Sequence, residues 1–141
     1  MAALPAPCSR LLDGLRTADL LSVERLSVGR AAAGVSMIAR PRMLPTTLGV
    51  DSAAATRMSW VTQMLGAREV ALGAGTWAAL RHGDRRATRL WLYAGLLSDA
   101  VDAIAIGAAV AQGRVSKVTG GAVVAIAGAA VYTQLDALSS D

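Results

Sequence analysis

Long apolar segments separated by short, arginine-containing connections restrict the fold of this chain more than any other feature. Three of them, 54–80, 89–112 and 118–137, reach the roughly 20 residues that a helix needs to cross a bilayer, and a shorter one, 25–39, precedes them. Charged residues make up only 17% of the chain, against about 25% in soluble domains. We therefore predict an all-α integral membrane four-helix bundle with these segments as spans; the alternative is a soluble bundle made apolar by alanine.

The N-terminal segment, residues 1–24, has a different pattern. Leu11, Leu12 and Leu15 recur near helical spacing, with Arg10 and Asp13 among them. This is typical of an amphipathic helix, which either lies in the headgroup plane or covers another part of the protein. We expect two regions, an N-terminal amphipathic segment over 1–24 and a four-helix transmembrane domain over 25–141.

Proline and aspartate mark the predicted ends of the first two spans. Pro41, between two arginines, disfavours helix at the residue before it, and Pro45 prolongs the break. A loop is expected to about Val50. Asp51 or Ser52 can then cap a long helix that runs to about Leu80.

The later connections are short. Gly83 suits the position after a helix end and Asp84 suits an N-cap, so the helices on either side should be antiparallel. Gly113 ends the third span, and Ser116 is the expected cap of the fourth.

The distribution of basic residues predicts the orientation. Those on one side are Arg10, Arg16, Arg25, Arg81, Arg85, Arg86 and Arg89; those on the other are Arg40, Arg42, Arg57, Arg114 and Lys117. The richer side is expected to be cytoplasmic, with both termini. The net charge of +4 does not indicate nucleic-acid binding, because the arginines flank apolar segments instead of forming a stripe with interleaved aromatics. The lipid bilayer is the expected partner.

Charged residues inside the predicted spans are the candidates for function: Arg30, Arg68, Glu69, Asp99 and Asp102. Each charge at the centre of a span costs roughly 2.5–3.5 kcal/mol, so they need partners. Asp99 and Asp102 share one helix face. Arg68 precedes the Gly83 turn by nearly as many residues as Asp99 follows it, which predicts a contact of Arg68 with Asp99 or Asp102.

Two interpretations of this intramembrane charge network remain open. Two arginines face three carboxylates, so one carboxylate could hold a proton or attract a cation. The alternative, which we favour, is an internal ion-pair network that fixes the register and rotation of the helices.

Small residues recur four positions apart on the predicted spans, which favours close approach of helix backbones. These helix-packing candidates are Gly29 with Ala33, Gly107 with Ala111, and Gly121 with Ala125.

Enzyme signatures are weak, and we expect no catalytic residues, no cofactor and no bound metal. His82 is the only histidine and sits in a charged turn, while Cys8 is the only cysteine, so a Cys/His metal site is excluded. Paired aspartates could hold Mg²⁺ in a lipid-handling membrane enzyme, but no adjoining motif supplies further ligands.

Three segments resemble a known family: GRAAAGVSMIARP (29–41), GAREVALGAG (66–75) and SDAVDA (98–103). Together they resemble a bacterial family of small four-span membrane proteins classed only as a domain of unknown function, over about 26–137. The resemblance implies that Arg30, Gly66, Arg68, Asp99 and Asp102 belong to the recurring pattern. It also implies a bacterial cytoplasmic (inner) membrane location, and no activity or ligand.

These observations together favour a non-enzymatic role. We expect an accessory or scaffold component that self-associates or joins a larger membrane-protein complex. The main alternative is a small proton- or cation-coupled carrier that uses Asp99 and Asp102.

Overall fold

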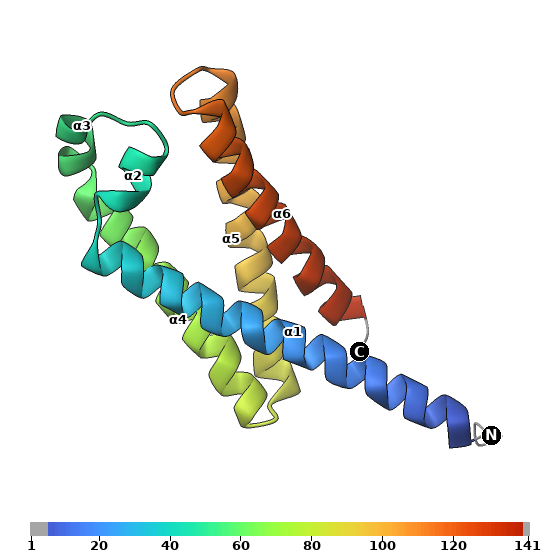
Figure 1. The fold of residues 1–141 in the computed structure, drawn as a ribbon. Coiled ribbons are helices and arrows are strands. Elements are labelled where there is room, and N and C mark those ends of the chain that lie inside the picture. Colours follow the sequence, from blue (N-terminus) through green and yellow to red (C-terminus); the bar gives the residue numbers. More distant parts are fainter. Residues whose placement is uncertain (1–5, 140–141) are drawn as a thin grey trace.

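The computed structural model describes the backbone of residues 6–139 and the side chains of residues 23–139, and this part of the chain is all-helical, as predicted, with no strand (Figure 1). The four long helices are α1 (Ala6–Ala39), α4 (Ser59–Arg81), α5 (Arg85–Ala111) and α6 (Lys117–Ser139). Two short helices, α2 (Met43–Thr47) and α3 (Ser52–Arg57), connect α1 to α4.

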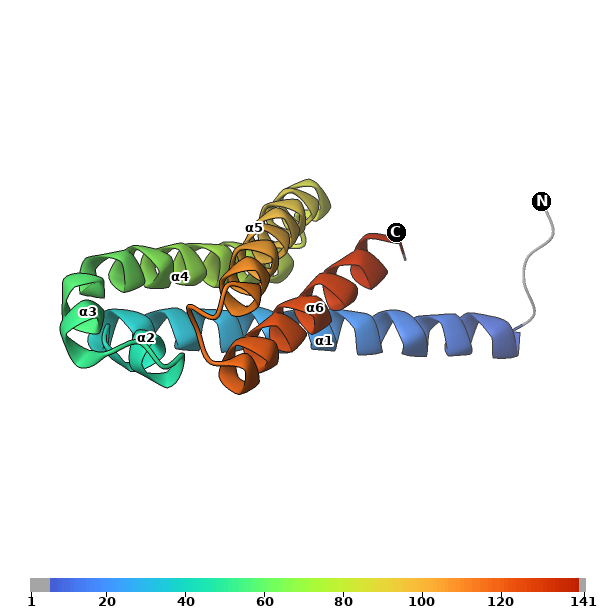
Figure 2. The ribbon, with the colours of Figure 1, turned by 90° about the horizontal axis from the view of Figure 1, so that it is seen from above.

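The long helices pack as two antiparallel pairs. α1 packs most extensively against α4, and α5 against α6, while contacts of α4 with α5 and of α1 with α6 join the pairs. Seen from above, α5 and α6 run across the α1/α4 pair (Figure 2). The start of α1 and the end of α6 lie toward the same end of the molecule as the α4–α5 turn (Figure 1).

The predicted turn between α4 and α5 is confirmed. Gly83 has a φ of +65°, a left-handed conformation that glycine adopts at little cost. Asp84 Oδ1 accepts a hydrogen bond from Ala87 N at 2.9 Å and so caps α5. Asp51 caps α3 in the same way, accepting from Ala54 N at 2.9 Å. These local signals fix the helix starts.

The structure departs from prediction in the α1–α4 connection. The segment expected to be a loop contains α2, which tolerates Pro45 because the first residues of a helix need no backbone N–H partner within it. The helix predicted from Ser52 to Leu80 is interrupted at Met58. The interruption is local, since Met58 N donates to Ala54 O at 2.9 Å and its carbonyl accepts from Thr62 N at 3.2 Å.

α1 is continuous across residues 24 and 25, where a boundary between two regions was predicted. An amphipathic face was predicted over residues 1–24. The side chains of residues 1–22 lie outside the described part of the chain, so this face stays a prediction.

At the end opposite Gly83, the two connections touch. Ser116 N donates to Leu48 O at 2.9 Å, which ties the α5–α6 loop to the residue after α2. The helix pairs are thus joined at this end as well.

Glycines allow α1 and α4 to approach closely. A Cβ atom on Gly34 would lie 2.5 Å from Gly66 O, and one on Gly66 would lie 2.7 Å from Gly34 O. A Cβ on Gly73 would lie 2.7 Å from Ala31 N. At these positions only glycine fits without moving one helix away from the other.

The helix-packing pairs predicted from the sequence are not the ones at which α1 and α4 approach closely. A Cβ added at Gly29, Gly107 or Gly121 would meet nothing within 4 Å among the described residues, so this part of the chain makes no close backbone approach there. Their partners Ala33, Ala111 and Ala125 are exposed. A spacing of four selects one face of a helix, but it does not say which face meets a neighbouring helix.

Buried residues are few and unusually polar. The buried apolar set is Val23, Ala55, Leu72, Ala79, Leu92 and Ala130, and the buried polar set is Ser27, Thr62, Thr76, Asp99 and Gln134. Two of the buried hydroxyl groups donate a hydrogen bond within their own helix. Ser27 Oγ donates to Val23 O at 2.7 Å, and Thr76 Oγ1 donates to Leu72 O at 2.8 Å. α5 and α6 are the two helices of the described chain that are long and apolar enough to cross a membrane.

Candidate functional site

A cluster of charged side chains lies where the two helix pairs meet. It contains all five charged residues singled out from the sequence: Arg30 from α1, Arg68 and Glu69 from α4, and Asp99 and Asp102 from α5. Ion pairs link them in the order Asp99, Arg30, Glu69, Arg68, Asp102. The structure thus brings together the five charged residues that were the candidates for function.

Arg30 is the centre of the inner half of this cluster. Its Nε lies 2.7 Å from Glu69 Oε2, and its Nη2 pairs with Asp99 Oδ1. The side chains of Arg30 and Asp99 are only 10% and 9% exposed. Gly95 makes room for the guanidinium group, because a Cβ there would lie 2.7 Å from Arg30 Nη1. The arginine therefore crosses from α1 to the surface of α5 at a position without a side chain.

Arg68 forms the outer half and confirms the predicted contact with an aspartate of α5. Its Nη1 donates to Asp102 Oδ1 at 3.2 Å, and its Nη2 pairs with Asp102 Oδ2 in a two-point contact. Nη2 also lies 3.0 Å from Glu69 Oε1. About a third of the side chain of Arg68 and of Asp102 is exposed, so this half of the cluster is more accessible than the Arg30 half.

Gln134 of α6 completes the cluster and was not predicted. Its Nε2 donates to Asp99 Oδ2 at 2.7 Å and to Ala130 O at 3.0 Å, and the residue is 1% exposed. Through Gln134 the network reaches all four long helices. A sequence signal existed, because this amide stands in the otherwise apolar run VTGGAVVAIAGAAVYTQL, where a polar side chain needs a partner.

The cluster is closed in terms of hydrogen bonding. Each carboxylate accepts from at least one arginine, and Asp99 accepts from Gln134 as well. Thr119 Oγ1 is the one buried side-chain polar atom of the described residues that lacks a partner, and it lies outside the cluster. No group of three or more His, Cys, Asp or Glu residues suited to a metal occurs in the described part of the chain. The arrangement is suited to holding helices together.

His82, the histidine of the charged turn, lies at the surface. The residue is exposed in the α4–α5 turn, and its Nδ1 lies 2.7 Å from Ala78 O, one helical turn back. Within the described part of the chain no charged group pairs with this ring, so its environment is that of an ordinary helix-end histidine.

Fold and cluster together define an all-helical protein whose four long helices are connected by buried ion pairs and one buried amide. The chain belongs to the family DUF4267, a domain of unknown function, which it matches over residues 27–133. The predicted resemblance to a family classed only in this way is confirmed. The match includes all five charged residues of the cluster and ends just before Gln134. No curated protein and no solved structure matches the chain.

Proposed function

We propose that this chain is a multi-pass protein of the bacterial cytoplasmic membrane with a non-enzymatic role, as an accessory or scaffold component of a membrane assembly. The observation that carries the proposal is a closed charge cluster inside a molecule whose outer surface is apolar. A cluster of charges that pair with one another holds four helices in a defined arrangement, which suits a structural role.

Membrane insertion is supported by the lack of burial of the most apolar helices. In the most apolar stretches of α5 and α6, only 11% and 17% of the residues are buried. The core helix of a soluble protein would be mostly buried. A lipid environment would cover these faces instead.

The distribution of side chains between surface and interior supports the same conclusion. Leu97, Ile104, Val118 and Ile126 are between 67% and 83% exposed, while the interior holds Asp99 and Gln134. Burial of polar groups at the expense of apolar ones is unfavourable in water. In a bilayer it is favourable, because lipid surrounds the apolar side chains and the polar ones find partners inside.

The ion pairs explain how α1 and α4, which carry central charges, could also cross the membrane. Arg30, Arg68 and Glu69 are satisfied by one another and by α5, so none of them faces lipid alone. α4 is 23 residues long, which suffices for about 30 Å of hydrocarbon. Trp60 and Trp77, both exposed near opposite ends of α4, suit its two interfaces.

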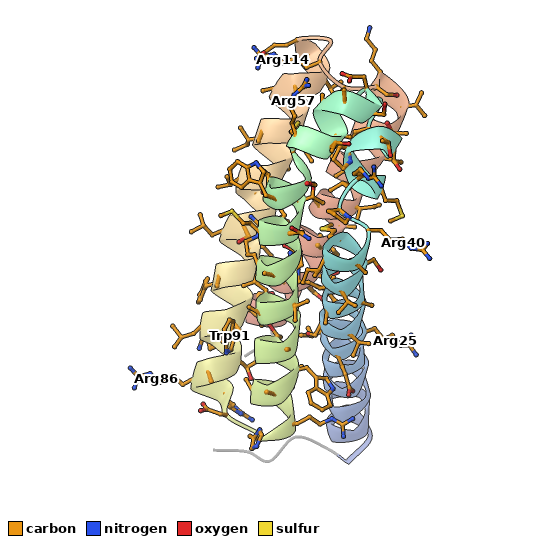
Figure 3. All side chains as sticks on the ribbon, turned by 90° about the vertical axis from the view of Figure 1, so that its left-hand side faces the viewer. Arg25, Arg40, Arg57, Arg86, Trp91 and Arg114 are labelled. Atoms are coloured by element: carbon orange, nitrogen blue, oxygen red, sulfur yellow. The ribbon has the colours of Figure 1, made fainter. Side chains whose placement is uncertain are left out.

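Arginines at the two ends of the molecule suit the two membrane surfaces. Arg86 lies near the α4–α5 turn, and Arg57 and Arg114 lie at the other end (Figure 3). The first end has the larger number of basic residues in the sequence, and we propose that it faces the cytoplasm with both termini.

Membrane insertion and orientation are tested together with single cysteines in a Cys8→Ser background. His82→Cys should react with an impermeant maleimide only after cells are permeabilised, and Arg114→Cys should react in intact cells. Release of the wild-type chain by an alkaline carbonate wash would contradict membrane insertion. The reverse labelling pattern would contradict the orientation alone.

Association with itself or with another membrane protein is proposed to use the open small-residue face of α6. Gly121 has no atom within 4 Å of an added Cβ, and Ala125, one turn on, is exposed. Gly121→Leu should shift the chain to smaller species in native gels from mild detergent, while Ala122→Leu on the adjacent face should not. Equal behaviour of both variants would remove this face from the proposal.

A second function, proton- or cation-coupled transport, is favoured by one observation. Two arginines of the cluster face three carboxylates, and the side chain of Asp102 is 33% exposed. A carrier predicts pH-dependent flux in proteoliposomes that Asp102→Asn abolishes without unfolding. Absence of flux in the wild type would leave the scaffold role alone.

A further inference from the structure

A cationic hollow lies on the outside of α5, away from the charge cluster. Arg85, Arg86, Arg89, Leu90 and Tyr93 line a surface pocket of about 380 Å³ at the start of this helix. We propose that it binds the phosphate of an anionic phospholipid, whose acyl chain follows the apolar face of α5. The inference rests on the proposed membrane location and adds to it a specific lipid site.

The three guanidinium groups are available for a ligand. None of the ion pairs recorded for residues 23–139 involves Arg85, Arg86 or Arg89. The preceding Arg81 differs, because it pairs with Glu24 at 3.2 Å and lies over the Trp77 ring at 5.1 Å.

The local electrostatics favour an anion. The nearest acidic residue along the chain is Asp84, which caps the helix, so three guanidinium groups outnumber one carboxylate here. The pocket is at the N-terminal end of a 27-residue helix, where the helix dipole adds positive potential. Guanidinium groups bind phosphate through paired N–H donors, so this arrangement suits a phosphate ester.

An apolar stripe continues from the arginines and indicates a lipid in preference to a soluble phosphate. The exposed residues Leu90, Tyr93, Leu97, Val101 and Ile104 follow one another at spacings of three and four, which places them along one face of α5. From first to last they cover about 21 Å of helix, more than the roughly 15 Å of one leaflet. A headgroup in the hollow would therefore leave its acyl chain against apolar side chains.

The basic residues at the opposite end of the molecule are arranged differently. Arg57 ends α3 and Arg114 lies in the α5–α6 loop, so these arginines come from separate elements (Figure 3). Arg86, by contrast, projects outward from α5 beyond the helices (Figure 3). The two ends can therefore be compared in one experiment.

The test measures binding of phosphatidylglycerol to the full chain in phosphatidylcholine nanodiscs by native mass spectrometry. The triple variant Arg85→Gln, Arg86→Gln and Arg89→Gln should bind about a hundredfold more weakly, since each basic residue near a headgroup contributes about a factor of five. The control removes as many charges at the other end, by Arg40→Gln, Arg42→Gln and Arg114→Gln. It should bind like the wild type.

The stripe is tested separately. Leu97→Gln should weaken binding of long-chain phosphatidylglycerol and leave binding of a short-chain form unchanged, which supports the proposal even if the triple variant folds poorly. Equal loss in the control would mean that only bulk surface charge matters and would overturn the site. Competition by glycerol phosphate as effective as that by the lipid would overturn the lipid assignment in favour of a soluble phosphate ester.

Failure of this inference can be told apart from failure of the proposed function. A chain that stays in carbonate-washed membranes, while its triple variant binds phosphatidylglycerol normally, overturns the lipid site only. A chain that leaves the membrane in that wash contradicts both.

Discussion

The ion pair between Arg30 and Asp99 connects α1 to α5, two helices that are not among the closely packed pairs of this fold. α1 packs mainly against α4, and α5 packs mainly against α6. Arg30 therefore reaches across the boundary between the two helix pairs, and its Nε holds Glu69 of α4 at the same time. This one side chain thus links both helices of one pair to a helix of the other.

Asp99→Asn should destabilise the protein by about 3 kcal/mol, because it leaves Arg30 buried with one carboxylate in place of two. The measurement is the temperature at which half of the detergent-purified protein is lost from the monodisperse peak. The exposed substitution Arg86→Gln serves as the control and should leave this temperature unchanged.

A double variant sharpens this prediction. Replacing both partners, Arg30→Met with Asp99→Leu, should give a protein more stable than either single variant, because no unpaired charge stays buried. Additive losses in the double variant would contradict an energetic coupling between the two residues.

Gln134→Leu should lower stability by about 1–3 kcal/mol, since Asp99 Oδ2 loses its buried amide donor. Thr133→Leu is the matched control, because the neighbouring hydroxyl donates only to Ala129 O of its own helix. An unchanged melting temperature in Gln134→Leu would mean that the amide does not support the aspartate.

The features that could be predicted from the sequence are those that local chemistry or charge balance decides. Gly83 and Asp84 specify their turn because left-handed backbone and N-capping each favour few residue types. Once that turn makes α4 and α5 antiparallel, counting residues places Arg68 at the depth of the aspartates, and the cost of an unpaired charge requires the contact.

The features that could not be predicted depend on helix rotation. Gly29 and Gly121 each have a small residue four positions on, yet an added Cβ at either would touch no neighbouring helix of the described residues. Gly34, Gly66 and Gly73 do face a neighbouring helix, because α1 and α4 turn those faces toward each other. Gln134 was missed for the same reason: nothing local shows that α6 points it at Asp99.

Gly73→Ala should separate α1 from α4 and cost about 1–3 kcal/mol, because the new methyl group would meet the backbone at Ser27 and Ala31. Gly29→Ala is the control on the same helix pair. With open space around it, this change should leave stability unchanged or raise it by about 1 kcal/mol through helix propensity. Equal melting temperatures for Gly73→Ala and the wild type would contradict the close crossing.

The two halves of the charge cluster should differ in their contribution to stability. Arg68 and Asp102 are each about one-third exposed, so Asp102→Asn should cost less than Asp99→Asn, whose partner Arg30 is almost fully buried. Arg68→Gln should cost more than Asp102→Asn, because Arg68 also pairs with Glu69. Arg68→Lys should recover part of the loss, since it keeps the charge but not the two-point contact with Asp102. The same detergent melting measurement ranks all four variants, and a loss in Asp102→Asn as large as in Asp99→Asn would show that the outer pair is as structural as the inner one.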